Sequence, residues 1–442
     1  MSKKCIMLLL DGLGDRSYPA LNDQTPLQAA HTPTLDHLAC NGANGLYHAA
    51  ALGQALPSEN AHFAMFGYDM IDFPGRGALE ALGAGIPMDM NQVAILSHFV
   101  AVRPTPQGTL ILEEGKPKAT EHEIKQLIDC VGYYAAPDGT VVQLHHTSGF
   151  RGILTLTGHV SPFVTDSDPM VHQQPVVAVV PWAAHTNDAA TCNCARVLYD
   201  YLVWVHHQLR DHPVNVARRK AGHAPLNGLV TQRAGQLKNI EPMAEKYGLR
   251  AMSIASGIVY HGLAAYLGMT VYKVKDTDRP GDDLARRLQS ALDELKDHDF
   301  IHVHTKTPDE AAHTKNPLAK RDVIERLDKG LAAVLKQLLA DPELLLIVAA
   351  DHSTPSAGPL IHSGEPVPLI FYGPGIRRDT VTRFDEIHAA PGALGMVRGK
   401  ELMYLILNHL DRAKLHGIMD TPVDQPYYPG HVESFRITIG KV

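Results

Sequence analysis

Short runs of branched aliphatic residues recur along the chain, each bounded by Gly, Asp or Pro. Such runs predict buried parallel strands, because a strand that is covered on both faces has no polar side. We expect these strands at Cys5–Leu10, Ala251–Ala255, Phe300–His304, Leu344–Ala349 and Pro368–Tyr372. Apolar residues at three- and four-residue spacing predict helices at Asp282–Lys296 and Arg321–Leu339. Alternating strands and helices indicate an α/β fold with a mostly parallel sheet flanked by helices.

The region from about residue 97 to 180 has a different pattern. Gly139–Leu144 and Gly152–Leu156 alternate between apolar and polar residues, and Thr120–Cys130 has helical spacing. This mixture predicts an α+β domain inserted into a larger core. We therefore expect residues 1–96 and 181–442 to form the core and residues 97–180 to form the insertion.

Composition narrows the class of protein. The chain has 442 residues, which suits two or three domains, and its formal net charge of −7 argues against non-specific nucleic-acid binding. The apolar run that ends at Leu10 meets Asp11 and Gly12 without a small-residue cleavage site, so we expect a strand of a cytoplasmic protein there. No run reaches the ~20 apolar residues of a membrane helix. The five cysteines have no framework spacing and are expected to be reduced thiols.

Aspartate and histidine residues stand at the ends of four predicted strands. These residues lie in four segments of the chain. Three segments follow a predicted strand, and the fourth is the loop before the last predicted strand. In an open α/β sheet, ligands bind beyond the carboxyl ends of the strands, so we expect these side chains to meet at one edge. The residues are Asp11, Asp309, His313, Asp351, His352 and His362.

Carboxylates and imidazoles together suit two divalent metal ions. The donor types favour Mn²⁺ or Zn²⁺, with Mg²⁺ or Co²⁺ as alternatives. Two ions about 3.5–4 Å apart can clamp the attacking and leaving oxygens of a displacement. Ser58 is the candidate nucleophile, because it stands just before an apolar helical stretch. As an alternative, Ser58 would only cap that helix.

Eight motifs occur in order between residue 5 and about residue 412. They are Leu10–Arg16, Thr25–Pro33, Ser58–His62, Gly75–Gly85, Thr165–Pro169, Asp211–Asn215, Pro308–His313 and Asp351–Gly364. In this order they resemble the alkaline phosphatase superfamily, and within it the cofactor-independent phosphoglycerate mutases of the archaeal type. The resemblance implies an alkaline-phosphatase-like core with an inserted α+β lid domain.

The resemblance also implies a division of ligands and a reaction. One metal would bind Asp309, His313 and His362, and the other would bind Asp11, Ser58, Asp351 and His352. Mutases of this family move phosphate from 3-phosphoglycerate onto the serine, hold the glycerate while it turns, and return phosphate to the other hydroxyl. The inserted domain would act as a lid, because water must not intercept the phosphoserine.

Substrate binding requires cations. Family members carry an arginine-rich stretch, D-R-R-A-G-R, where this chain reads Leu112–Lys118. The remaining candidates are Arg16, Arg76, Arg151, Arg218, Arg219 and Lys306. We prefer Arg151, which lies inside the expected lid.

Three functions remain open from the sequence. The first is a mutase acting on a small phosphorylated three-carbon acid, without a nucleic-acid or membrane partner. The second is a metal-dependent phosphatase, or another hydrolase of phosphate or phosphonate esters, on the same scaffold. The third is a non-catalytic binding protein, which the retained ligand-type residues disfavour. A homo-oligomer is compatible with each.

Overall fold

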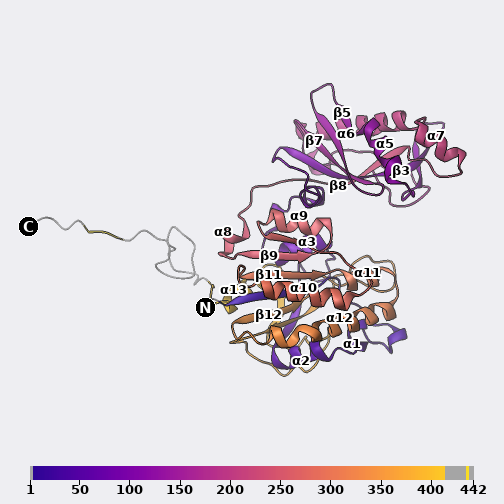
Figure 1. The fold of residues 1–442 in the computed structure, drawn as a ribbon. Helices are drawn as coiled ribbons and strands as arrows, with labels where there is room; N and C mark the ends of the chain where they lie inside the picture. The colour runs from indigo at the N-terminus through magenta and orange to yellow at the C-terminus, as the bar shows by residue number, and fades with distance from the viewer. Residues whose placement is uncertain (1–2, 414–434, 438–442) are drawn as a thin grey trace, which may run out of the picture. The chain divides into compact units, whose positions relative to one another are not determined.

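The computed structural model describes residues 3–413 and 435–437. These residues form two compact units (Figure 1). The first unit comprises residues 3–71, 241–256 and the described residues from 267 onward, and the second comprises residues 72–240 and 257–266. Residues 1–2, 414–434 and 438–442 of the expected core lie outside the described residues.

The first unit contains an eight-stranded sheet. Its strand order is β10 (Thr270–Lys273), β9 (Ala251–Ala255), β11 (Phe300–Thr305), β1 (Lys4–Leu10), β12 (Leu344–Ala349), β13 (Val367–Tyr372), β2 (Ala43–His48) and β14 (Gly395–Arg398). All run in one direction except β13, which is antiparallel to both of its neighbours. The five predicted strands and the mostly parallel α/β class are confirmed.

Helices pack against both faces of this sheet. Leu8 and Leu10 on β1 line a small apolar cavity with leucines of α2, α10 and α12. The register pairs Met7 with His302, and the His302 ring lies 5.1 Å from the Phe66 ring beside α3. Side chains of β1 therefore alternate between two helix-covered faces, which is why its sequence shows an unbroken apolar run.

Eight helices belong to the described part of the first unit, and α10 and α12 begin with residues that favour a helix start. They are α1 (Pro26–Ala29), α2 (Pro33–Asn41), α3 (Ser58–Met65), α8 (Met243–Tyr247), α10 (Pro280–Glu294), α11 (Thr307–His313), α12 (Pro317–Leu338) and α13 (Glu401–His409), with short turns η1 (Pro19–Leu21) and η2 (Met70–Asp72). The two predicted helices correspond to α10 and α12, which begin earlier than expected. Each has proline in its first turn, and the Asn316 side chain caps α12.

The second unit is an α+β domain with an antiparallel sheet. The strand order is β4 (Leu110–Glu114), β3 (Gln92–Pro104), β7 (Arg151–Thr157), β6 (Val141–Ser148) and β5 (Tyr133–Ala135), and β8 (Gly228–Gln236) pairs with β3. The helices are α4 (Arg76–Gly83), α5 (Glu121–Val131), α6 (Ala189–Leu209), α7 (Pro213–Lys220) and α9 (Ile258–Tyr266), with the turn η3 (Ala183–His185). One apolar cluster joins the sheet to α5 and α6.

The second unit is larger than the expected insertion of residues 97–180. Strand β3 begins at Gln92, and β8 adds a strand to its other edge. Leu198 and Tyr201 of α6 belong to the apolar cluster of this unit. Helices α4 and α9 also pack closely, since a Cβ on Gly262 would meet the Leu79 carbonyl at 1.7 Å. The apolar face of α6 thus places residues beyond 180 in the second unit.

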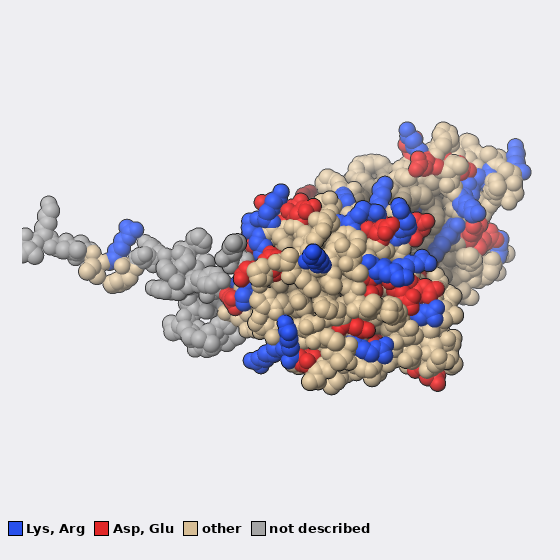
Figure 2. All heavy atoms as spheres, turned by 60° about the horizontal axis from the view of Figure 1, so that its bottom comes forward, with Lys and Arg blue, Asp and Glu red and all other residues tan. Residues whose placement is uncertain are grey.

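Two observations concern the surface. No helix among the described residues is long and apolar enough to cross a membrane. On the face that Figure 2 shows, lysine and arginine side chains are interspersed with aspartate and glutamate. That face therefore lacks the single-sign basic surface that nucleic-acid binding requires.

Candidate metal centre and anion-binding cavity

The strand directions bring the predicted aspartates and histidines to one edge of the first unit's sheet. Asp11 directly follows β1, Asp351 follows β12, and Asp309 lies on α11 just after β11. These three strands are parallel, so their carboxyl ends share an edge. Because β13 runs the other way, its amino end lies at that edge, and the loop that precedes it brings His362 there.

Ser58 reaches the same edge after β2. The N-cap of α3 is Pro57, and Ser58 is the first helical residue. Ser58 therefore does not occupy the N-cap position of this helix. Instead Ser58 Oγ lies 2.9 Å from His352 Nε2, and the side chain is buried.

One ligand group surrounds His352. Asp11, Asp351 and His352 each offer a ligand atom, and these atoms lie within 4.8 Å of one another. His352 Nε2 is 3.1 Å from Asp351 Oδ2 and 3.5 Å from Asp11 Oδ1. All three residues are buried. The geometry brings together the residues expected for one metal, with the Ser58 hydroxyl beside them.

A second group lies around Asp309. Asp309 Oδ1 is 3.2 Å from His313 Nε2 and 3.6 Å from His362 Nε2. The Nδ1–H of His362 donates to the Leu56 carbonyl at 2.7 Å, which directs Nε2 toward Asp309. His352 also belongs to this group, because its ligand atom lies within 4.8 Å of those of Asp309 and His362. In this structure the two groups therefore share His352.

Three residues behind the carboxylates were missed by sequence reasoning. His304 Nε2 is 3.0 Å from Asp11 Oδ2, and His62 Nδ1 is 3.3 Å from Asp351 Oδ2. The Thr354 hydroxyl donates to Asp309 Oδ1 at 2.8 Å. Such contacts orient carboxylate ligands. His62 stands four residues after Ser58, one helical turn away, and this spacing was the available signal.

The electrostatics of the cluster suit divalent cations. Burial, together with the charges of Asp351 and Asp309, raises the pKa of Asp11 to about 7. Burial alone would lower the pKa of His352, but Asp351 and Asp11 raise it to about 9. Buried carboxylates that repel one another are stabilised by a cation, and mixed oxygen and nitrogen donors match Mn²⁺ or Zn²⁺. The residues present thus fit divalent metal ions, as the sequence predicted.

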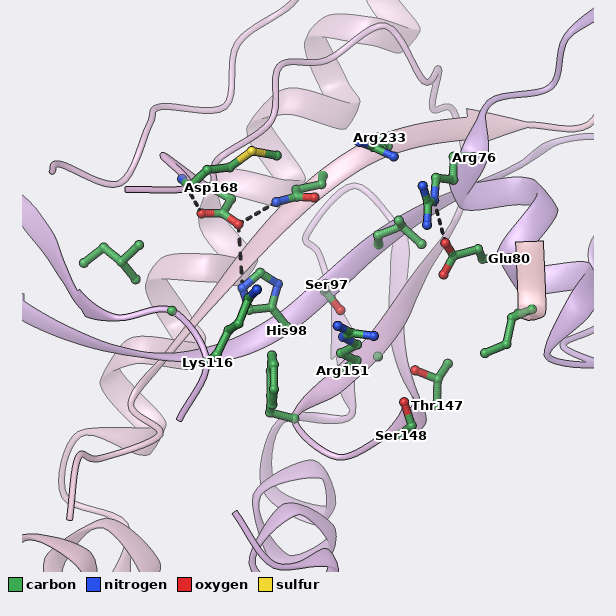
Figure 3. Close-up of a pocket in the computed structure, with 18 of the residues that line it drawn as sticks. Arg76, Glu80, Ser97, His98, Lys116, Thr147, Ser148, Arg151, Asp168 and Arg233 are labelled. Carbon is green, nitrogen blue, oxygen red and sulfur yellow. Dashed lines mark hydrogen bonds and ion pairs between the residues drawn. The ribbon is translucent and has the colours of Figure 1, made fainter. Parts of the chain in front are cut away.

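The second unit contains a separate polar cavity of about 860 Å³ (Figure 3). It lies on the face of the β3 and β7 strands and is bordered by α4 and the β4 end. Its cations are Arg76, Lys116, Arg151 and Arg233, and its acidic residues are Glu80, Glu114 and Asp168. The Arg76 guanidinium is paired with Glu80 at 2.6 Å. Cations exceed carboxylates, so the cavity favours an anionic ligand.

His98 and Ser97 add neutral hydrogen-bonding groups to this cavity. Burial lowers the pKa of His98, Asp168 at 3.6 Å opposes this, and the charges of Arg151 and Lys116 lower it further. Ser97 is 4% exposed, and its Oγ has no hydrogen-bond partner among the described residues. A buried hydroxyl without a partner is costly unless a ligand satisfies it.

The other predicted cations lie in different environments. Arg16 forms an ion pair with Glu365 at 2.7 Å in the first unit, and Lys306 stands between β11 and α11, close in the chain to the candidate ligand Asp309. Arg218 is buried, where it pairs with Glu123 and donates to the Lys118 and Ala224 carbonyls. Arg219 donates to the Arg210 carbonyl. Neither Arg218 nor Arg219 lines the cavity, so we withdraw both as substrate ligands.

Two of the six candidate cations, Arg76 and Arg151, line this cavity, and the sequence did not indicate several of their neighbours. His98, Lys116 and Asp168 come from three separate segments. Asp168 lies in one of the motifs that carried the family resemblance, and this was its only signal.

Comparisons with known proteins identify the class first. A family model described as the metalloenzyme superfamily matches residues 3–409. This is the class that the mostly parallel sheet and the clustered ligands define.

Individual relatives then narrow the family. The chain is 40% identical over 422 residues to the 2,3-bisphosphoglycerate-independent phosphoglycerate mutase 2 of Methanocaldococcus jannaschii, covering 94% of this chain and 95% of that protein. It is 34% identical to the corresponding mutase of Methanopyrus kandleri, covering 94% and 99%. The chain therefore belongs to the family of archaeal-type cofactor-independent phosphoglycerate mutases.

Solved structures agree with this assignment. A Pyrococcus horikoshii protein superposes with a TM-score of 0.77 at 28% identity, covering 95% of this chain and 100% of that one. The cofactor-independent phosphoglycerate mutase of Thermoplasma acidophilum gives a TM-score of 0.65 at 28% identity, covering 92% and 99%. The resemblance inferred from the motifs is thus confirmed.

Proposed function

We propose that this chain interconverts 3-phosphoglycerate and 2-phosphoglycerate without 2,3-bisphosphoglycerate, through a phosphoserine at Ser58. The main support is the position of Ser58 Oγ, which lies 2.9 Å from His352 Nε2 among the clustered carboxylates and histidines. The family membership supports the same substrate. Such a step belongs to glycolysis in the cytoplasm.

Two divalent cations, Mn²⁺ or Zn²⁺, complete the proposed site. Asp11, Asp351 and His352 would hold one with Ser58, and Asp309, His313 and His362 would hold the other. When bound, such cations lower the pKa of a coordinated hydroxyl and neutralise phosphoryl oxygens. His304, His62 and Thr354 orient the carboxylates for this task.

The reaction needs two displacements at phosphorus. The Ser58 hydroxyl loses its proton and its Oγ forms a bond to phosphorus, while the bond from phosphorus to the C3 oxygen of the substrate breaks and that oxygen takes a proton. Glycerate then turns, and its C2 oxygen loses a proton and bonds to phosphorus. The bond from phosphorus to Ser58 Oγ breaks, and Oγ takes a proton, which restores the hydroxyl. Ser58 opens helix α3, whose first amide groups favour phosphate charge.

The cavity of the second unit supplies the cations for substrate binding. Arg151 is exposed and lies 5.7 Å over the Phe150 ring. Its forked guanidinium can bind a carboxylate or phosphate with two hydrogen bonds. Lys116 and the Ser97 hydroxyl line the same space. Retaining glycerate is what separates a mutase from a phosphatase, because released glycerate leaves the phosphoserine to water.

A product analysis tests the reaction. With Mn²⁺ and 3-phosphoglycerate as the sole substrate, we expect 2-phosphoglycerate to form without added 2,3-bisphosphoglycerate. Phosphorus NMR follows both isomers and free phosphate in one sample. Free phosphate as the only product would contradict the mutase and establish the hydrolase alternative. Metal-free protein, prepared with a chelator, serves as the blank.

Replacement of Arg151 by alanine tests the cavity. We expect kcat/KM for 3-phosphoglycerate to fall roughly 10- to 100-fold, because a charge-assisted hydrogen bond contributes about 1.5–3 kcal/mol. Arg196→Ala is the matched control, since Arg196 is an exposed arginine on α6 that pairs with Asp138 and does not line the cavity. Equal kinetics for the two variants would remove Arg151 from substrate binding.

A further inference from the structure

Lys315 adopts a backbone conformation that residues with side chains rarely take. Helix α11 ends at His313, Thr314 is its C-cap, and Lys315 follows with φ at 58°. Its N–H donates back to the Ala312 carbonyl at 2.9 Å, which closes the helix end. Glycine is the usual residue at such a position, because it has no Cβ to clash. A lysine here is strained, so the contacts of its side chain become informative.

The Lys315 ammonium spans the loop that carries two of the proposed metal ligands. Lys315 Nζ donates to the Pro355 carbonyl at 2.9 Å and to the Leu360 carbonyl at 2.7 Å. Both carbonyls lie between His352 and His362 in the chain. The base of this loop is closed by the Ser363 N–H, which donates to the Ser353 carbonyl at 3.0 Å. The Lys315 ammonium thus binds this loop at two carbonyls, those of Pro355 and Leu360.

This contact joins the two segments that form the second ligand group. Helix α11 carries Asp309 and His313, and the loop carries His362. Asp309 Oδ1 lies 3.6 Å from His362 Nε2, a separation that depends on how the loop is held against the helix end. A cation site requires its ligands to be held within a fraction of an ångström, and supporting contacts provide this order.

We propose that Lys315 is a positioning residue that holds His362 within reach of Asp309 and His313, and thereby preorganises one of the two cation sites. The inference rests on the proposed two-cation function, but it concerns assembly of the site and not the chemistry. Lys315 touches neither the substrate nor the reacting oxygen in this role.

Hydrogen exchange of the metal-free protein tests this clamp, the contact of Lys315 Nζ with the Pro355 and Leu360 carbonyls, and requires neither metal nor activity. In Lys315→Gly the ammonium is lost and the backbone strain is relieved, so the fold is retained. We expect amide exchange in the peptide covering residues 354–362 to be faster by about tenfold or more, because a held loop opens less often. Asn22→Gly is the matched control, since Asn22 also has a positive φ, at 54°, and lies at the end of η1.

Metal titration tests the consequence for the site. Apo-protein is titrated with Co²⁺ by calorimetry, and we expect one of two dissociation constants to rise by about tenfold in Lys315→Gly while the other is unchanged. Lys315→Arg keeps a donor and should restore most of the affinity. At saturating Mn²⁺ the kcat of Lys315→Gly should approach that of the wild type, as expected for a residue that assembles the site.

The outcomes separate the inference from the proposed function. Wild-type exchange and wild-type Co²⁺ affinities in Lys315→Gly would overturn the role of Lys315, whatever the enzyme's product. Failure of the wild-type protein to form 2-phosphoglycerate would overturn the mutase proposal, while faster exchange and weakened Co²⁺ binding in the variant would still support the clamp.

Discussion

Replacing Ser58 by alanine is expected to abolish turnover of 3-phosphoglycerate, with kcat/KM falling by about 10⁴-fold or more. The variant removes the oxygen to which phosphate is transferred, and the water that replaces it cannot store the phosphoryl group. The Asp and His ligands stay in place, so metal content measured by mass spectrometry should remain near two ions per chain. Steady-state assays with 3-phosphoglycerate give the kinetic result.

A second buried serine serves as the control that shows whether the loss of turnover is specific to Ser58. Ser363 is also buried and follows His362 in the loop, and Ser363→Ala should keep turnover within a few-fold of wild type. Substantial activity in Ser58→Ala would eliminate Ser58 as the nucleophile. Loss of activity together with loss of both metals would instead show that Ser58 matters chiefly for assembling the site.

Replacing Lys320 by methionine is expected to destabilise the first unit by about 3–5 kcal/mol, because breaking a buried ion pair leaves its partner charged and unpaired. Lys320 Nζ is fully buried, 3.1 Å from Asp15 Oδ2, and donates to the Gly14 and Thr354 carbonyls. It therefore ties the loop after Asp11 to the loop after Asp351. Urea unfolding followed by circular dichroism measures the effect.

The exposed Lys329 on the same helix is the control for this prediction. Lys329→Met changes the same charge at the surface and should shift the unfolding free energy by less than about 0.5 kcal/mol. Adding Asp15→Asn to Lys320→Met removes the uncompensated carboxylate and should recover part of the loss. Equal stabilities for Lys320→Met and Lys329→Met would show that the buried pair contributes nothing.

The clustering of the candidate metal ligands could be predicted because its signals are local to strand ends. Runs such as Leu344–Ala349 are unbroken aliphatics, so both the strand and the polar residues after it were visible in the sequence. Parallel strands then place Asp11 and Asp351 at one edge without any knowledge of the loops. Strand β2 (Ala43–His48) was missed, since Asn44 and Gly45 interrupt its apolar pattern.

The second unit was predictable in class but not in extent. The amphipathic pattern of α6 (Ala189–Leu209) shows that the helix has an apolar face, but not which sheet that face covers. The cavity depends on the register of β3 with β7, which pairs His98 with Arg151. Register is specified by side-chain packing across the sheet, so it cannot be read from either strand alone.

The place of β1 in the sheet has a consequence for biosynthesis. This strand leaves the ribosome long before its two neighbours in the sheet, β11 and β12, which begin at residues 300 and 344. Most of the second unit is continuous in sequence and can fold while later residues are still being added. During this time the apolar strand β1 has no neighbouring strand on either edge. Pairing between strands so far apart in sequence is slow, and unpaired strand edges are prone to aggregate. Nascent chains of this enzyme should therefore depend on chaperones until β12 has emerged.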